Sequence, residues 1–122
     1  MRRQICAMKR FFQLITGLEE TVYEKFGLTL TEAMVLCSVS GGCTVAQDLA
    51  TEVRLSPSRL SRVLSALEKK GLVERQRSVV DKRSLINKPS LQGEQLIQRI
   101  NSEGIELPKE LEFVLEALPQ GV

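Results

Sequence analysis

The sequence predicts a mainly α-helical protein with one small β-hairpin, folded as a single domain over residues 1–122. Apolar residues recur at spacings of three and four in several segments, which is the period of an amphipathic helix. Two short stretches, 72–75 and 84–87, have the appearance of paired strands instead. With 43% hydrophobic residues, few aromatic ones and no Trp, the chain is expected to build a core of Leu, Val and Ile.

The first helix is expected over residues 2–26, because apolar side chains form one stripe along it. The stripe comprises Ile5, Met8, Phe12, Ile15, Leu18 and Val22. Gly27 ends this helix, since glycine tolerates the left-handed backbone of a helix C-terminus.

A second helix is expected over about 31–39. Thr29 has capping-box spacing with Glu32, and Thr31 is the alternative N-cap. Gly41 follows the helix and breaks it.

A third helix is expected over about 45–53. Thr44 and Gln47 again have capping-box spacing. The residues expected to be buried are Val45, Leu49 and Ala50. Arg54 and Leu55 form the tight turn that follows.

The fourth helix, over about 57–70, carries the strongest functional pattern. Ser56 is a good N-cap, and Pro57 occupies the first helical position, where its missing N–H costs nothing. The apolar stripe that faces inward comprises Leu60, Val63, Leu64 and Leu67. The opposite face carries small hydroxyls and arginines, namely Ser58, Arg59, Ser61, Arg62 and Ser65. Such a face suits DNA, because Arg bonds guanine edges and Ser reaches phosphates or bases; the alternative is an ordinary solvated helix face.

A basic hairpin loop over residues 76–83 connects the two expected strands. Arginines on such a loop can enter an adjacent minor groove. The residues expected to bind DNA from the hairpin, or wing, are Arg75, Arg77, Lys82 and Arg83. Asp81 is expected to pair with a nearby Arg and stiffen the loop.

Positive charge is concentrated in residues 54–88. This segment has ten Lys or Arg and three Asp or Glu, a net charge of +7, although the whole chain carries only +2. Residues 89–122 carry −4. One part of the molecule is therefore expected to attract phosphate while another does not.

Two helices joined by a tight turn and followed by a hairpin form the order of a winged helix-turn-helix, which places its second helix in the DNA major groove. We expect sequence-specific binding of double-stranded DNA. The alternative is a winged-helix protein-interaction module, which would more often show exposed apolar anchors on the fourth helix. The chain has no His, no metal-ligand cluster, no Gly-rich phosphate loop and no nucleophile–base pair, so we expect neither an enzyme nor a cofactor.

Two further helices are expected over about 90–103 and 108–118, each apolar on one face. These faces can pack on the domain itself or on a second copy of the chain.

Cys6, Cys37 and Cys43 form an odd set with no CxxC motif. A disulfide framework or a zinc site is therefore not expected, and three free thiols are the simplest interpretation. The alternative is a redox-sensing thiol, for which Cys6 is the best candidate because basic residues lie near it.

No run of about 18 apolar residues exists, and the segment MRRQICAMKRFF lacks the features of a signal peptide. We expect no membrane span and a cytoplasmic location.

These residues together resemble the MarR (multiple antibiotic resistance regulator) family of bacterial transcription regulators. The similar stretches are LTLTEAMVL (28–36), DLATEVRLSPSRLSRVLSALEKKGLVER (48–75), the DxR element at 81–83 and the SxxG element at 90–93. The resemblance covers roughly residues 28–100.

The resemblance implies a homodimer on a palindromic operator. Residues 28–88 would be the DNA-binding core of each protomer, and the helices in 1–26 and 90–122 would interlock for dimerisation. Members of the family are usually repressors.

The same resemblance implies which element of the protein would contact each groove of the DNA. Residues 56–70 would be the recognition helix in the major groove, with Ser56 among its DNA-binding residues. Arg77, Asp81 and Arg83 would be the wing residues at the minor groove. Repression would be relieved by a small-molecule effector, anionic or phenolic, or by Cys oxidation.

Overall fold

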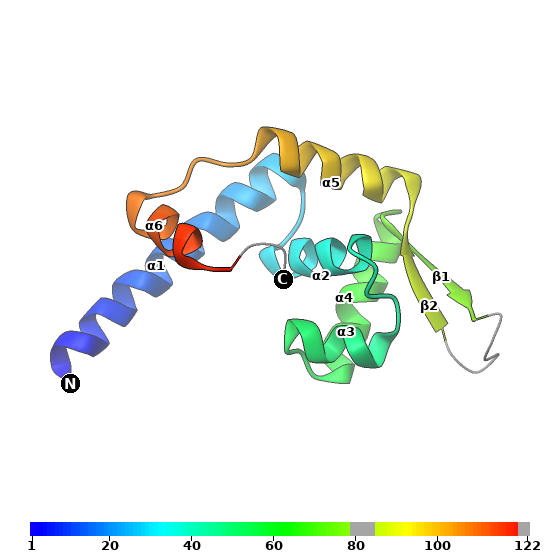
Figure 1. The fold of residues 1–122 in the computed structure, drawn as a ribbon, viewed down its shortest axis with the longest axis horizontal. Coiled ribbons are helices and arrows are strands. Elements are labelled where there is room, and N and C mark those ends of the chain that lie inside the picture. The colour runs from blue at the N-terminus through cyan, green and yellow to red at the C-terminus, as the bar shows by residue number, and fades with distance from the viewer. Residues whose placement is uncertain (79–84, 120–122) are drawn as a thin grey trace.

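The computed structural model describes residues 1–78 and 85–119 (Figure 1). Within them lie six helices and one antiparallel hairpin, which confirms the predicted fold class. In chain order the elements are α1 (Arg2–Phe26), α2 (Leu30–Ser40), α3 (Ala46–Val53), α4 (Pro57–Lys69), β1 (Val73–Arg77), β2 (Leu85–Pro89), α5 (Leu91–Glu103) and α6 (Lys109–Ala117). Among the described residues, no helix has the length and apolar character needed to cross a membrane.

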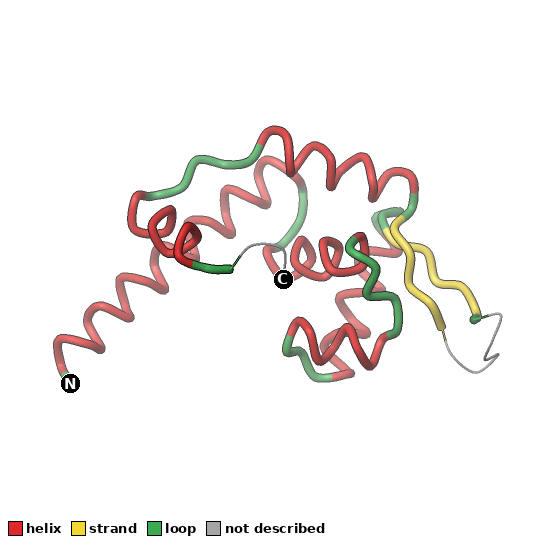
Figure 2. The backbone as a smooth tube through the Cα atoms, in the orientation of Figure 1, coloured by secondary structure: helices red, strands yellow, loops and turns green. Residues whose placement is uncertain are grey.

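The molecule has a compact part, made of α2, α3, α4 and the hairpin, and a longer part made by α1 (Figure 2). In Figure 1, α5 runs above α2 from the hairpin back towards α1, and the N-terminal half of α1 projects away from the compact part. The first helix begins and ends at the predicted residues. Gly27 caps its C-terminus with a left-handed backbone (φ 71°, ψ 19°), as expected.

The hydrophobic core is centred on α2. Val35, Leu36 and Val39 are at most 1% exposed, and they meet leucines from α3 and α4. The fully buried leucines are Leu28, Leu36, Leu49, Leu60 and Leu67. The core is therefore mainly aliphatic, as its composition predicted, and Phe26 adds an aromatic ring to it.

Two of the three expected caps on the central helices are confirmed. Thr29 forms a full capping box, since its Oγ1 accepts from the backbone N–H of Glu32 and its own N–H donates to Glu32 Oε1 at 2.8 Å. Ser56 Oγ accepts from the N–H of Arg59, and Pro57 is the first residue of α4.

The expected cap at Thr44 is wrong. The N-cap of α3 is Val45, which has an extended backbone and makes no side-chain cap. The Thr44 carbonyl instead accepts hydrogen bonds from the backbone N–H and the Nδ2 of Asn87, at 2.9 and 3.0 Å. Val45 forms a β-bridge with Ile86 and is 41% exposed, so its expected burial is also wrong, whereas Leu49 and Ala50 are buried as expected. Pairing with a distant strand takes precedence here over the local cap.

The hairpin is displaced from the predicted stretches by one or two residues. Its register pairs Val73 with Pro89 and Arg77 with Leu85. Four residues with a predicted role lie outside the described residues, namely Asp81, Lys82, Arg83 and Ser84.

Helix α5 is held tightly against the base of the hairpin. Ser90 caps α5 by accepting from the N–H of Gly93, and its Oγ donates to the carbonyl of Gly71 at 2.5 Å. A Cβ atom at Gly93 would lie 2.1 Å from the backbone oxygen of Leu72. The SxxG element is thus a cap combined with a close helix–backbone contact that only glycine permits.

We expect Gly93→Ala to lower the free energy of unfolding by about 2 kcal/mol or more, because a rigid backbone carbonyl blocks the added methyl group. Gly17→Ala is the matched control. Gly17 is in α1, where an added Cβ atom would meet nothing within 4 Å, and the same change there should raise stability by about 0.5–1 kcal/mol through helix propensity. Chemical denaturation measures both, and equal effects of the two changes would contradict the close contact at Gly93.

Candidate nucleic-acid interface

Helix α4 is oriented by its apolar stripe. Leu60, Leu64 and Leu67 are 2%, 3% and 0% exposed, and Val63 is half-buried. These leucines pack against α2 and α3, so the opposite side of α4 faces outward. The predicted direction of the stripe is confirmed.

The outward side of α4 is the Ser/Arg face that the sequence predicted. Ser58, Arg59, Ser61 and Arg62 are exposed, and Ser65 is half-buried. The side chains of Arg59 and Arg62 make no hydrogen bond or ion pair with any described residue. No described residue therefore competes with an external ligand for either guanidinium group.

Ser56 stands apart from this face. Its Oγ is committed to the cap of α4 and lies 3.3 Å from Ser58 Oγ. Its observed role is thus to fix the start of α4, and its expected contact with DNA stays a prediction.

Arg75 lies between the hairpin and α4. It is half-buried on β1, and its Nη2 donates to the backbone oxygen of Ser61 at 3.4 Å. Its Nε is buried without a hydrogen-bond partner among the described residues. Arg77, two residues further on, is exposed near the end of β1. Of the two arginines, Arg75 thus joins the hairpin to α4, and Arg77 is at the accessible end of the strand.

A hollow of about 510 Å³ is lined by residues of α3, α4 and the hairpin. Its lining is mostly apolar and includes Leu55, Leu60, Leu64 and Leu85, with Arg75 and Asn87 on the hairpin side. Ser61, which belongs to the Ser/Arg face, also lines the hollow.

Arg54 is an exposed cation in the turn between α3 and α4, and it was not among the residues expected to bind DNA. It ends α3 with a left-handed backbone (φ 55°, ψ 47°), and no other non-glycine residue among those described has a positive φ. Its exposed side chain lies two residues before the cap of α4. A left-handed backbone is unfavourable for a bulky residue and easy for glycine, so this conformation marks Arg54 as a candidate site residue.

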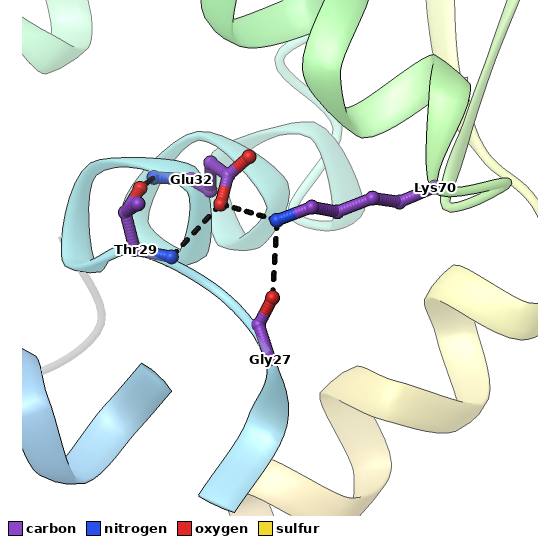
Figure 3. Close-up of polar contacts among 4 residues, drawn as sticks. All are labelled: Gly27, Thr29, Glu32 and Lys70. Atoms are coloured by element: carbon purple, nitrogen blue, oxygen red, sulfur yellow. Dashed lines mark hydrogen bonds and ion pairs between the residues drawn. The ribbon is translucent and has the colours of Figure 1, made fainter. Parts of the chain in front are cut away.

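The C-terminal end of α4 is anchored by Lys70 (Figure 3). Lys70 Nζ donates to Glu32 Oε1 at 2.8 Å and to the backbone oxygen of Gly27 at 3.0 Å. Burial by itself would raise the pKa of Glu32. The hydrogen bonds from Lys70 and from the N–H of Thr29, together with the Lys70 charge, outweigh it and hold the pKa below its ordinary value.

The three cysteines are free thiols. Cys6 and Cys37 are exposed, and Cys43 is half-buried. Burial, a hydrogen bond to Glu52 and the negative charges of Glu52 and Asp48 raise the pKa of the Cys43 thiol, which makes it a poor nucleophile. Redox sensing by Cys6 stays a prediction. Within residues 1–78 and 85–119, no three His, Cys, Asp or Glu side chains gather as metal ligands would.

A helix pair whose second helix presents an exposed Ser/Arg face, followed by an antiparallel hairpin, defines the winged helix-turn-helix class of DNA-binding proteins. Residues 28–85 match the model of the MarR family. Over this segment the chain is similar to the MarR family, whose members are transcription regulators and not enzymes. No curated protein sequence matches the chain.

Solved structures of similar proteins share the fold over nearly the whole chain. AbfR of Staphylococcus epidermidis is 26% identical, with 94% of this chain and 86% of that chain covered and a TM-score of 0.72. AbsC, a MarR family transcriptional regulator from Streptomyces coelicolor, is 23% identical, with coverages of 97% and 90% and a TM-score of 0.68. A variant of MepR from S. aureus, solved bound to an oligodeoxyribonucleotide, is 17% identical, with coverages of 98% and 86% and a TM-score of 0.66.

We expect the stability of the protein to depend on pH through Glu32. Because the folded-state pKa is lowered, the carboxylate stabilises the fold above its ordinary pKa of 4.5, and this contribution is lost as the pH falls through the folded value. Glu32→Gln should cost about 1–2 kcal/mol at pH 7 and progressively less below pH 4.5. Urea denaturation between pH 3 and pH 7 measures the difference, and a constant difference across this range would contradict the assignment.

Proposed function

We propose that the protein is a sequence-specific DNA-binding transcription regulator, acting as a repressor, that binds a palindromic operator as a homodimer. In this proposal α4 enters the major groove and the hairpin reaches the minor groove. The observation that carries the proposal is the Ser/Arg face of α4, where Arg59 and Arg62 are exposed and have no protein partner among the described residues.

The chemistry of this face suits a groove. Guanidinium groups bond guanine O6 and N7 in pairs, and serine hydroxyls are small enough to permit close approach to bases and phosphates. With 13 residues, α4 is about 20 Å long, which is enough to lie in a major groove. The net charge of +7 over residues 54–88 favours the phosphate backbone.

The proposal of a homodimer rests on apolar surface that the single chain leaves uncovered. In the α1 stripe, Val22 is buried, but Ile5, Met8 and Phe12 are 59%, 59% and 66% exposed. In α6, Leu111 is buried, whereas Phe113 is 76% exposed. Apolar faces on both terminal helices favour a second copy of the chain as their partner, and a two-fold dimer would present two copies of α4 to a palindrome.

A protein-interaction module is the alternative function. Protein interfaces usually contain a buried cluster of aromatic or aliphatic anchors. The outward side of α4 offers Ser58, Arg59, Ser61 and Arg62 instead, so its composition favours DNA.

The first experiment is selection from a pool of randomised DNA duplexes at near-physiological salt. We expect enrichment of an inverted repeat whose half-sites are separated by about one helical turn, 34–36 Å. Retention without an enriched motif would contradict sequence-specific recognition. An absence of retention would favour the protein-interaction module.

We expect Arg62→Ala to remove sequence preference at its base pair, with a loss of discrimination of about 5- to 150-fold. Arg77→Ala and Arg83→Ala should instead weaken binding to all sequences and lower the salt dependence, as loss of a phosphate contact does. Binding titrations on the enriched site and on single-base variants separate the two effects. Unchanged preference in Arg62→Ala would show that the recognition helix has been placed wrongly.

We expect Phe12→Glu to shift the protein from dimer to monomer, with a dissociation constant raised about 100-fold or more, because it would bury a carboxylate in an apolar contact. Gln13→Glu is the control, since it adds the same charge at the neighbouring exposed position. Sedimentation equilibrium measures both variants. Equal dissociation constants for the two would contradict dimerisation through the α1 stripe.

A further inference from the structure

We propose that Lys70 is a positioning residue that sets the distance between the two recognition helices of the dimer, and hence the spacing of half-sites that the protein accepts. This inference rests on the proposed function, because it needs a dimer that binds a palindrome. Its basis is a joint of four residues, Gly27, Thr29, Glu32 and Lys70, which we call the Lys70 joint (Figure 3).

The Lys70 joint connects three elements at one ammonium group. Lys70 directly follows the last residue of α4, and its Nζ contacts the backbone oxygen of Gly27, which ends α1. The same Nζ contacts Glu32 Oε1, and that oxygen also accepts from the N–H of Thr29 at the start of α2. The end of the recognition helix is therefore tied to the point where α1 leaves the compact part of the molecule.

The end of α1 is also tied to α5. Lys25 Nζ donates to the backbone oxygen of Gly104 at 2.7 Å. The Phe26 ring is buried and has the cations of Lys25 and Arg99 at 5.6 and 5.4 Å from its centroid. This end of α1 is thus held by α5 on one side and by the Lys70 joint on the other. A rotation at the Lys70 joint would therefore move α1 as one rigid rod.

Because α1 is long, a small rotation at one of its ends displaces the other end by about the rise of one base pair. Its 25 residues span about 37 Å at 1.5 Å per residue. A rotation of about 5° at one end of a rod of this length moves the other end by roughly 3 Å, close to the 3.4 Å rise of one base pair. Since the exposed apolar stripe is on the far half of α1, the joint controls how α4 is placed relative to the partner protomer.

Lys69 provides a matched control in the adjacent position. It is exposed, carries the same charge, and makes no hydrogen bond or ion pair with any described residue. The side chain of Glu32 is 7% exposed, whereas that of Lys70 is 37% exposed. Loss of the Lys70 ammonium therefore leaves the Glu32 carboxylate without its charged partner, and loss of the Lys69 ammonium changes only the net charge.

The test compares full-length wild type, Lys70→Gln, Lys70→Arg and Lys69→Gln on three duplexes. These are the palindrome enriched by selection and two versions with one base pair inserted or removed between the half-sites. Circular dichroism establishes that each variant is folded at the temperature of the titration. If Lys70→Gln does not fold, Glu32→Gln replaces it, because that change weakens the same contact and keeps the Lys70 charge.

We expect wild type to bind the native spacing more tightly than the altered spacings, and the ratio of the dissociation constants measures this preference. In Lys70→Gln the ratio should fall about tenfold. Lys70→Arg should retain most of the ratio. Lys69→Gln should weaken binding to all three duplexes by the same factor and leave the ratio unchanged.

Two results would overturn the inference in distinguishable ways. If Lys70→Gln and Lys69→Gln both keep the wild-type ratio, Lys70 does not position the recognition helices, while the proposed function stands. If wild type binds none of the duplexes, the proposed function fails and the inference fails with it.

Discussion

The constraint on which the rest of the structure depends is the burial of the leucine side of α4. Leu60, Leu64 and Leu67 are removed from water against α2 and α3, which stabilises the core by about 1.5–3 kcal/mol for each side chain. Because an α-helix has only one orientation that buries this stripe, the same packing turns Arg59 and Arg62 outward. Stability and the candidate interface are thus two consequences of the same packing.

The elements around α4 fix its remaining freedom. Ser56 caps its start, Lys70 anchors its end, and Arg75 connects its middle to the hairpin through the backbone of Ser61. The hairpin is in turn held by α5, where Gly93 permits direct contact with the backbone of Leu72. A helix fixed at both ends and along one side can present its outward face with little reorganisation, which favours specific recognition of a rigid ligand such as duplex DNA.

Local signals in the sequence were reliable where no distant segment competed for the same groups. The caps at Thr29 and Ser56 and the stop at Gly27 depend on residues within four positions, and the structure confirms all three. Thr44 failed as a cap because Asn87, 43 residues away, takes its carbonyl group and because Val45 pairs with Ile86. The spacing of Thr44 and Gln47 is as good as that of Thr29 and Glu32, so only the fold distinguishes them.

The sequence by itself determined the order and type of the elements, the buried side of α4 and the basic character of its surroundings, because these follow from periodicity, caps and charge along the chain. Only the tertiary structure decided which side chains from elements far apart in the sequence contact one another. The contact of Lys70 with Glu32 spans 38 residues, and the contact of Arg75 with Ser61 spans 14. Periodicity records which face of an element is buried, but it carries no information about which distant residue lies opposite, so these contacts require the fold itself.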